Sequence, residues 1–436
     1  MKLSIINMSK KITYLILVLV TILGSLKAQN TTNSPYSQFG LGDIKPMLVP
    51  QQISMGGIAV GLRKTGGYSM INVANPAAYS AINLSTMDMG ASLDMRTLSK
   101  AGASEKLTNG TLGHFLVGIP VNKRSALTFG LMPFSDLGYQ YRMHTLVDTF
   151  KVDHLYSGEG GLSKAHLGYG YQFGKKLSLG FNLAYIFGNL KVRQSAEFPE
   201  DPYALATRTQ SDKSLGGLNF QYGVQYTFNP AAKSIITLGY SGTASSRIKS
   251  SGSITNYRYR YDAVAQAESE PLDTLYYNPA AASKINLPIT QAVGISISRP
   301  DHWTVGADFT YTKWSGLTDG GTNAGLNDAY SVSLGGQYTP DITAVSNYLK
   351  LIDYSLGFRY DKTYININNM PIKQYALSFG MGLPLPANRS TFYKINLSGE
   401  LGKRGSLSNG LVKENYLTIH LGFVINDRWF IKTKYD

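Results

Sequence analysis

The stretch LSLGFNLAYIF, residues 177–187, decides the fold class of this chain of 436 residues. Every odd position holds a large, mostly apolar side chain, and the even positions hold small or polar residues, with Ile186 as the one exception. Successive side chains of a strand point to opposite faces, so the stretch predicts a strand with one apolar and one small, polar face. A soluble sandwich would bury that apolar face, whereas a membrane barrel would turn it toward lipid.

The same alternation recurs along the chain, for example over residues 87–96, 218–228 and 303–311. We count roughly fourteen such segments of about ten residues, which is the length a tilted strand needs to cross a bilayer. Many end in aromatic residues, as the girdles of a barrel require. The opposite face is rich in Gly, Ser and Asn. Since closure removes unpaired edges, the sequence predicts an all-β fold, a transmembrane antiparallel β-barrel of about 14 strands.

The first residues indicate export. Lys10 and Lys11 precede an apolar run, residues 12–23, and Ala28 offers a cleavage point, so residues 1–28 are predicted to be a signal peptide. An uncleaved membrane anchor is the alternative, but the run is short for a span. The chain has no Cys, which excludes a lipid-modified N-terminus and disulfides. Together with the barrel pattern, this predicts a location in the cell outer membrane.

The charge of the chain points to polyanionic surroundings. The predicted signal peptide carries four lysines and no acid, so its removal lowers the net charge from +14 to +10. A basic exported protein meets the phosphates of outer-membrane lipid and the anionic sugars of lipopolysaccharide. No Lys/Arg-rich run or recognition motif indicates a nucleic acid as a partner.

Residues 29–85 do not alternate and are predicted to form a separate segment ahead of the barrel, residues 86–436. A tail of roughly fifty residues is long for an inert extension of a compact domain. Its apolar content favours an N-terminal hatch, or plug, packed in the lumen over a disordered periplasmic arm. Two longer polar stretches, residues 195–214 and 261–283, are predicted to be surface loops. They could be short periplasmic excursions, but long loops of bacterial barrels are normally extracellular.

Three stretches carry a resemblance to a known family. Residues 56–79 lead through small residues to Asn75, Pro76 and Ala77, and resemble the hatch of FadL-type outer-membrane transporters. Residues 302–315 and 356–384 resemble later strands of the same family. The resemblance, to a divergent subgroup, implies a 14-stranded barrel with a hatch that passes long-chain fatty acids or other hydrophobic compounds. Transport in that family is attributed to hatch movement and a lateral opening in the wall.

Residues that carry chemistry are sparse. The six histidines form no metal-binding spacing, and no nucleotide-binding loop or nucleophile motif is present, so we expect no enzyme, cofactor or metal. On strands, His114, His166, His302 and His420 would face the lumen with several aspartates, most simply as a hydrated network. The candidate ligand-binding and hatch residues are Arg63, Asn75, Pro76, Ala77 and Arg96. Either arginine can meet a ligand carboxylate or instead pair internally with Asp88 or Asp94.

Two functions follow from these features. In the first, the barrel is a passive channel for hydrophobic or amphipathic small molecules. In the second, it is a non-transporting subunit or adaptor of a larger outer-membrane machine for protein secretion or outer-membrane protein assembly. A lumen filled by the hatch, without a continuous apolar path, would favour the second.

Overall fold

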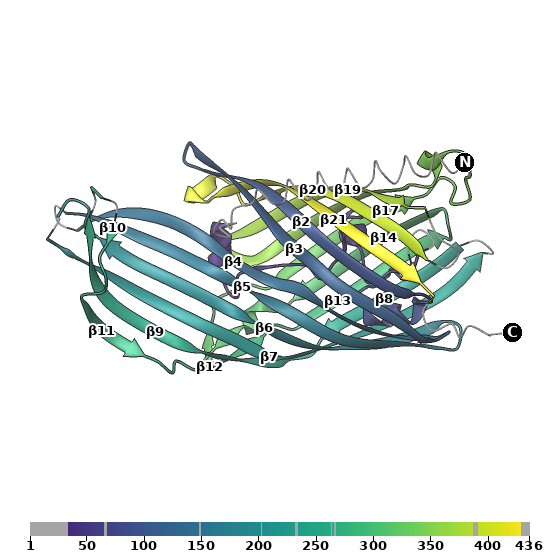
Figure 1. Ribbon diagram of the computed structural model, residues 1–436, viewed down its shortest axis with the longest axis horizontal. Coiled ribbons are helices and arrows are strands. Elements are labelled where there is room, and N and C mark those ends of the chain that lie inside the picture. The colour runs from purple at the N-terminus through teal and green to yellow at the C-terminus, as the bar shows by residue number, and fades with distance from the viewer. Residues whose placement is uncertain are drawn as a thin grey trace.

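The computed structural model describes residues 34–64, 68–147, 150–201, 203–231, 234–262, 264–265, 267–386 and 391–428. The predicted signal peptide lies outside these residues. Within them, fourteen antiparallel strands form a closed barrel, because the first strand pairs with the last as well as with the second (Figure 1). The barrel strands are β2 (Ser85–Lys100), β3 (Ala103–Asn122), β4 (Ser125–Val147), β5 (Phe150–Phe173), β6 (Leu177–Glu197), β7 (Leu205–Ala231), β8 (Ser234–Thr243), β13 (Thr290–Arg299), β14 (Trp303–Thr312), β17 (Ala329–Tyr338), β18 (Asp353–Ile367), β19 (Met370–Pro384), β20 (Phe392–Arg404) and β21 (Lys413–Asp427).

The alternation of β6 places its apolar residues on the outside of the barrel. Phe181, Leu183 and Tyr185 are 44, 46 and 48% exposed, and Ser178 and Asn182 are fully buried in the interior. An apolar outer band of this size would be costly in water, so it faces lipid. The predicted fold class is confirmed.

The strands on one side of the barrel are much longer than a membrane crossing requires. β4, β5, β6 and β7 are 23, 24, 21 and 27 residues long, and they extend well past the rest of the wall (Figure 1). The prediction of a loop over residues 195–214 is therefore wrong, since β6 and β7 leave only residues 198–204 between them. Beyond the bilayer the outer face need not be apolar, so these polar residues still form strands.

A small sheet accompanies the long strands. β9 (Ser246–Asp262) pairs with residues 205–216 of β7. It also pairs with β10 (Ala267–Glu268), β11 (Asp273–Asn278) and β12 (Ser283–Leu287). The polar stretch 261–283 is thus partly strand rather than loop. β15 (Thr318–Asp319) and β16 (Thr322–Asn323) form a further hairpin, and short 3-10 turns lie at η3 (Trp314–Gly316), η4 (Tyr348–Lys350) and η5 (Ser408–Gly410).

The described residues ahead of β2, 34–64 and 68–84, lie inside the barrel. They form η1 (Pro35–Gln38), β1 (Asp43–Ile44), α2 (Pro50–Ile53) and η2 (Pro76–Ala81). Apolar hatch residues such as Met55, Ile58 and Ile71 are fully buried and pack in one cluster with Leu116 of β3 and Met132 of β4. Among the described residues no helix is long and apolar enough to cross a membrane.

Candidate functional site

Polar side chains of the wall hold the hatch by its backbone. Gln225 of β7 donates from Nε2 to the carbonyls of Val60 and Leu62, at 2.9 and 3.1 Å. The carboxylate of Asp308 on β14 accepts from the amides of Ala59 and Val60, at 2.6 and 2.7 Å. A buried backbone group without a partner costs free energy, so these contacts fix the hatch to specific strands.

Lumen-facing glycines let the hatch touch the wall. A Cβ on Gly357 of β18 would lie 2.0 Å from the amide nitrogen of Gly56, and a Cβ on Gly180 of β6 would lie 2.3 Å from the carbonyl of Pro76. Real Cβ atoms do not approach this closely, so only glycine permits the observed packing. The small side chains predicted for the inner face of the strands therefore leave room for the hatch at these points.

The candidate residues Asn75, Pro76 and Ala77 organise one of these contacts. Asn75 Oδ1 accepts from the Ala77 amide at 3.1 Å and so caps η2, while Nδ2 donates to the Val60 carbonyl at 2.8 Å. η2 then places the Tyr79 hydroxyl 3.0 Å from Asn182 Oδ1 of β6. Asn75, Pro76 and Ala77 are buried, and their role toward a ligand remains a prediction.

The two candidate arginines are separated by the structure. Arg63 donates to the hydroxyls of Ser178 and Ser80, at 2.5 and 3.1 Å. Arg96 forms ion pairs with Glu414 at 2.9 Å and with Asp94 at 2.8 Å. Arg96 therefore has the internal pairing with Asp94 considered from the sequence, whereas the partners of Arg63 among the described residues are hydroxyl groups. Their role toward a ligand remains a prediction.

An ion-pair network ties residues 34–45, which we name the strap, to the wall. Arg404 of β20 binds Asp43 at 2.8 Å, and Lys45 lies 3.3 Å from Asp136 of β4. At the other end of the strap, the Ser34 hydroxyl donates to Glu414 at 2.5 Å. The strap thereby connects the last strands of the barrel with β4. None of these partners could be paired from sequence, since they are up to 380 residues apart.

The charges around the strap set the ionisation of its own groups. Burial raises the pKa of the Asp43 carboxyl, but Arg404 and Lys45 outweigh it and hold that pKa well below its usual range. Burial lowers the pKa of Lys45, and Asp43 and Asp136 raise it above its usual value. Both groups are therefore charged near neutral pH.

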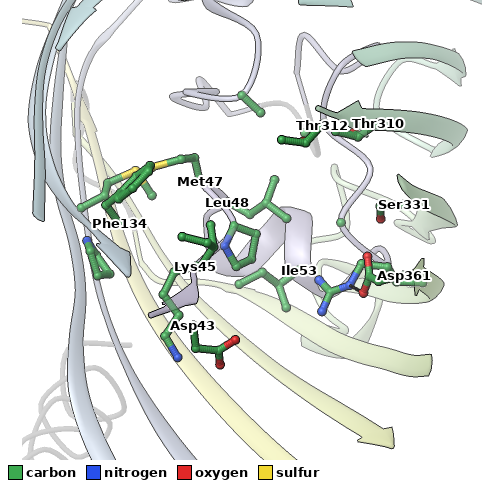
Figure 2. A pocket seen from close by; sticks show the side chains of 18 of the residues that line it. Asp43, Lys45, Met47, Leu48, Ile53, Phe134, Thr310, Thr312, Ser331 and Asp361 are labelled. Carbon is green, nitrogen blue, oxygen red and sulfur yellow. Dashed lines mark hydrogen bonds and ion pairs between the residues drawn. The ribbon is translucent and has the colours of Figure 1, made fainter. Parts of the chain in front are cut away.

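A cavity of about 620 Å³ lies between the hatch and the wall. Figure 2 shows hatch residues Lys45, Met47, Leu48 and Ile53 in it, with Phe134 beside Met47 and Asp361 on the far side. Its lining mixes these apolar side chains with charged ones, namely Asp43, Lys45, Asp94, Arg96, Asp136, Lys164, Asp308, Arg359, Asp361, Lys362, Glu400 and Arg404. The lumen beside the hatch is therefore not a continuous apolar path.

The cavity also holds Lys164, which belongs to none of the sequence motifs. Lys164 of β5 is 5% exposed and lines the cavity. The described residues provide it with no hydrogen bond or ion pair. The sequence does carry a signal for this residue, since a lysine at a lumen-facing position of an alternating strand indicates a functional site.

The predicted histidine network is only partly present. His114 Nε2 lies 2.8 Å from Asp88, and His166 and His420 also face the interior. The placement of His302 on a strand is wrong, because it lies in the turn before β14. In the described part of the chain no three His, Cys, Asp or Glu residues are grouped to hold a metal ion.

Several solved structures share this fold. A FadL homologue from Pseudomonas aeruginosa is 13% identical with a TM-score of 0.60, covering 89% of this chain and 100% of its own. The toluene transporter TodX of Pseudomonas putida is 14% identical with a TM-score of 0.57, covering 89% of this chain and 100% of its own. The CymD monoaromatic hydrocarbon channel is 14% identical with a TM-score of 0.53, covering 89% of this chain and 99% of its own.

These similarities confirm a divergent FadL-type barrel, and none of the three structures is described as an enzyme. No curated protein matches the sequence. A family model described as BamG matches residues 8–436, nearly the whole length. This chain therefore belongs to the BamG family, with the fold of a FadL-type barrel closed around an N-terminal hatch.

Proposed function

We propose that this protein is a plugged, non-transporting barrel subunit of an outer-membrane machine that assembles β-barrel proteins. The observation that carries the proposal is the fixed attachment of the hatch to the wall. The hatch is bound through its own backbone to β7 and β14 and touches glycines of β6 and β18. A hatch that must move during transport would not need so many specific backbone anchors.

The character of the cavity supports the same function. Its charged residues are mostly engaged in pairs, for example Arg359 with Asp361 at 3.0 Å and with Glu400 at 2.9 Å. A hydrophobic compound would have to pass these desolvated charges, which is unfavourable.

Depletion of the protein in its own cells tests this function. We expect the amounts of other β-barrel proteins in the outer membrane to fall together, while uptake of toluene and of long-chain fatty acids is unchanged at early times. Quantitative mass spectrometry of outer membranes and radiolabelled uptake provide the two readouts. Early loss of uptake with normal barrel-protein levels would contradict the proposal.

Lys164 favours a second candidate function, binding or conduction of an amphipathic carboxylate. A buried cation without a counter-ion is unfavourable, and a ligand carboxylate in the cavity would supply one. Met132 and Ile186 lie opposite Lys164 on the neighbouring strands, and they would contact the apolar part of the ligand.

The substitution Lys164→Met tests this second function. A hydrogen bond to a charged group contributes about 1.5–3 kcal/mol, so we expect the affinity for dodecanoate to fall about tenfold to a hundredfold. Titration of the purified barrel by calorimetry measures the affinity, and Lys362→Met is the control at a second cavity lysine. Equal affinities of wild type and K164M would exclude a carboxylate site at Lys164.

A further inference from the structure

Three basic side chains, which we name the basic patch, lie on the outer face of the sheet that β9 and β12 form beside β7. The patch consists of Arg247 and Lys249 of β9 and Lys284 of β12. All three residues are exposed, whereas Ile248 and Ile285, which alternate with them along the two strands, are buried. Because alternate residues of a strand share a face, the three cations point away from the barrel interior.

The basic patch begins where the apolar outer face of the wall ends. On β7 the outward residues Phe220 and Leu218 are 42 and 58% exposed, and the next outward residue is Gly216. Gly216 pairs with Lys249 of β9, and the same register continued by two residues places Arg247 beside Leu218. The patch therefore lies at the border between the lipid-facing band and water.

This border belongs to the end of the barrel at which the long strands β4 to β7 project (Figure 1). The long connections 244–289 and 313–328 leave the barrel at the same end, whereas the paired residues Ser85 and Asp427 lie at the opposite end. Bacterial barrels have short periplasmic turns and longer extracellular loops. The patch is therefore at the level of the outer leaflet, where the phosphates of lipopolysaccharide lie between hydrocarbon and water.

The charges of the patch are not balanced within the described part of the chain. Lys249 lies directly opposite Lys284, and like charges in this position repel each other. The acids on the adjoining strands β7 and β15, Asp212 and Asp319, bind other lysines. None of the three patch residues has an ion pair or a side-chain hydrogen bond with a described residue. An anion between them would replace this repulsion by attraction.

An open hollow of about 340 Å³ accompanies the patch. It is lined by Arg247, Lys284, Asn286, Gly320 and Gly321. The two glycines form the turn of the β15–β16 hairpin, and the Gly320 amide donates to the Lys284 carbonyl at 3.1 Å, which holds this turn beside β12. Two cations and a side-chain amide thus border one open space, and no acid is among its lining residues.

We propose that the basic patch binds a phosphate group of lipid A, the phosphorylated glycolipid anchor of lipopolysaccharide. Arg247 and Lys284 contact the phosphate oxygens in the hollow, and Lys249 adds a third positive charge beside them. The acyl chains of the same lipid lie along Leu218 and Phe220, which continue from the patch over the apolar outer face. A free phosphate would meet only the charges, whereas the adjoining apolar row favours a lipid.

The lipid site does not depend on the proposed function, because a plugged subunit and a transporter are embedded in the same leaflet. It assigns a ligand class to residues on the outside of the barrel, whereas the cavity and the hatch lie inside it.

Lipid binding by the purified full-length chain in a neutral detergent tests the site. The patch variant combines Arg247→Gln, Lys249→Gln and Lys284→Gln. A control variant removes one arginine and two lysines from exposed turns at the opposite end of the barrel, namely Arg124→Gln, Lys175→Gln and Lys176→Gln. Native mass spectrometry measures the affinity of each protein for lipid A, and heat-modifiable migration in a gel confirms that each barrel is folded.

The contribution of one basic residue near an anionic lipid surface implies that loss of all three weakens the binding of lipid A about a hundredfold. The control variant should bind lipid A as the wild type does. Wild type should also bind lipid A about a hundredfold more tightly than the same lipid after removal of its phosphates with hydrofluoric acid. Inorganic phosphate should bind much more weakly than lipid A, because it has no acyl chains.

Three results would overturn the assignment. Equal binding of lipid A by wild type and by the patch variant, or an equal loss in the control variant, would show that the patch is not the binding site. Equal binding of phosphorylated and dephosphorylated lipid by wild type, which needs no variant, would show that the phosphate is not recognised. Binding of inorganic phosphate as tight as that of lipid A would indicate a site for a free anion instead of a lipid.

Discussion

The variant Gly357→Ala should displace the hatch from the wall. The added Cβ would lie 2.0 Å from the Gly56 amide nitrogen and 2.1 Å from the Met55 carbonyl carbon, and both are backbone atoms that cannot rotate away. Overpacking costs about 1–3 kcal/mol, and each 1.4 kcal/mol shifts an equilibrium about tenfold. We therefore expect the displaced fraction to rise by about tenfold to a hundredfold.

Conductance in planar bilayers measures the displacement. Wild type should give little ion current, G357A should give more, and a double variant with Gly180→Ala should give the most, because the two contacts are separate. Gly316→Ala is the control, since a Cβ there meets no atom within 4 Å. If G357A retains the wild-type current and the hatch stays protected from protease, the close contact does not hold the hatch in place.

The variant Arg404→Ala should release the strap. Arg404 is the closest cation to Asp43, and removing one member of a buried ion pair costs about 3–5 kcal/mol because the other charge stays buried. We expect proteinase K to cut within residues 34–45 of folded R404A but not of wild type. Heat-modifiable migration in a gel confirms that the barrel itself remains folded, and continued protection of the strap would show that this ion pair is dispensable.

The onset of strap release on acidification should lie at higher pH in R404A than in wild type. In wild type the pKa of Asp43 is lowered, so its contribution is complete above the ordinary pKa and is lost only in strong acid; attachment should not change between about pH 5 and 8. In R404A only Lys45 and Arg96 are left to oppose burial, so the pKa of Asp43 is higher than in wild type. The remaining attachment should then be lost at a higher pH than in wild type, as protonation removes the attraction between Asp43 and Lys45.

The wall could be predicted from sequence because lipid imposes a strict rule on it. Phe181 and Leu183 must face outward and Asn182 inward, and this regularity is visible in a single strand. The rule no longer applies to strand segments outside the bilayer, whose outer face need not be apolar. For this reason the polar residues 195–214 of β6 and β7 resemble a loop in the sequence. His302 was misplaced for a related reason, since it directly precedes an alternating strand but belongs to the turn.

The hatch was predictable as a segment but not in its contacts. The sequence indicates Asn75, Pro76 and Ala77 as hatch residues, and the structure places them at the start of η2. The groups that hold the hatch, such as Gln225 and Asp308, read from sequence only as polar lumen positions. The pairing of β3 with β4 ends at Phe115 and Leu131, next to irregularities at Gly113 and Pro133 in two different strands, so it becomes visible only in the structure.

The mass of the particle that contains this protein tests the proposed function most directly. The chain alone carries a purification tag, and it is extracted from its native membranes in a mild detergent together with any untagged partners. The mass of the purified particle is then measured by light scattering and native mass spectrometry. We expect a stable assembly that contains at least one further outer-membrane barrel protein, with the hatch protected from protease inside it. A particle of the chain alone, at 47.6 kDa or less after loss of the predicted signal peptide, together with hydrocarbon or fatty-acid uptake in liposomes, would contradict a plugged subunit and favour a transporter.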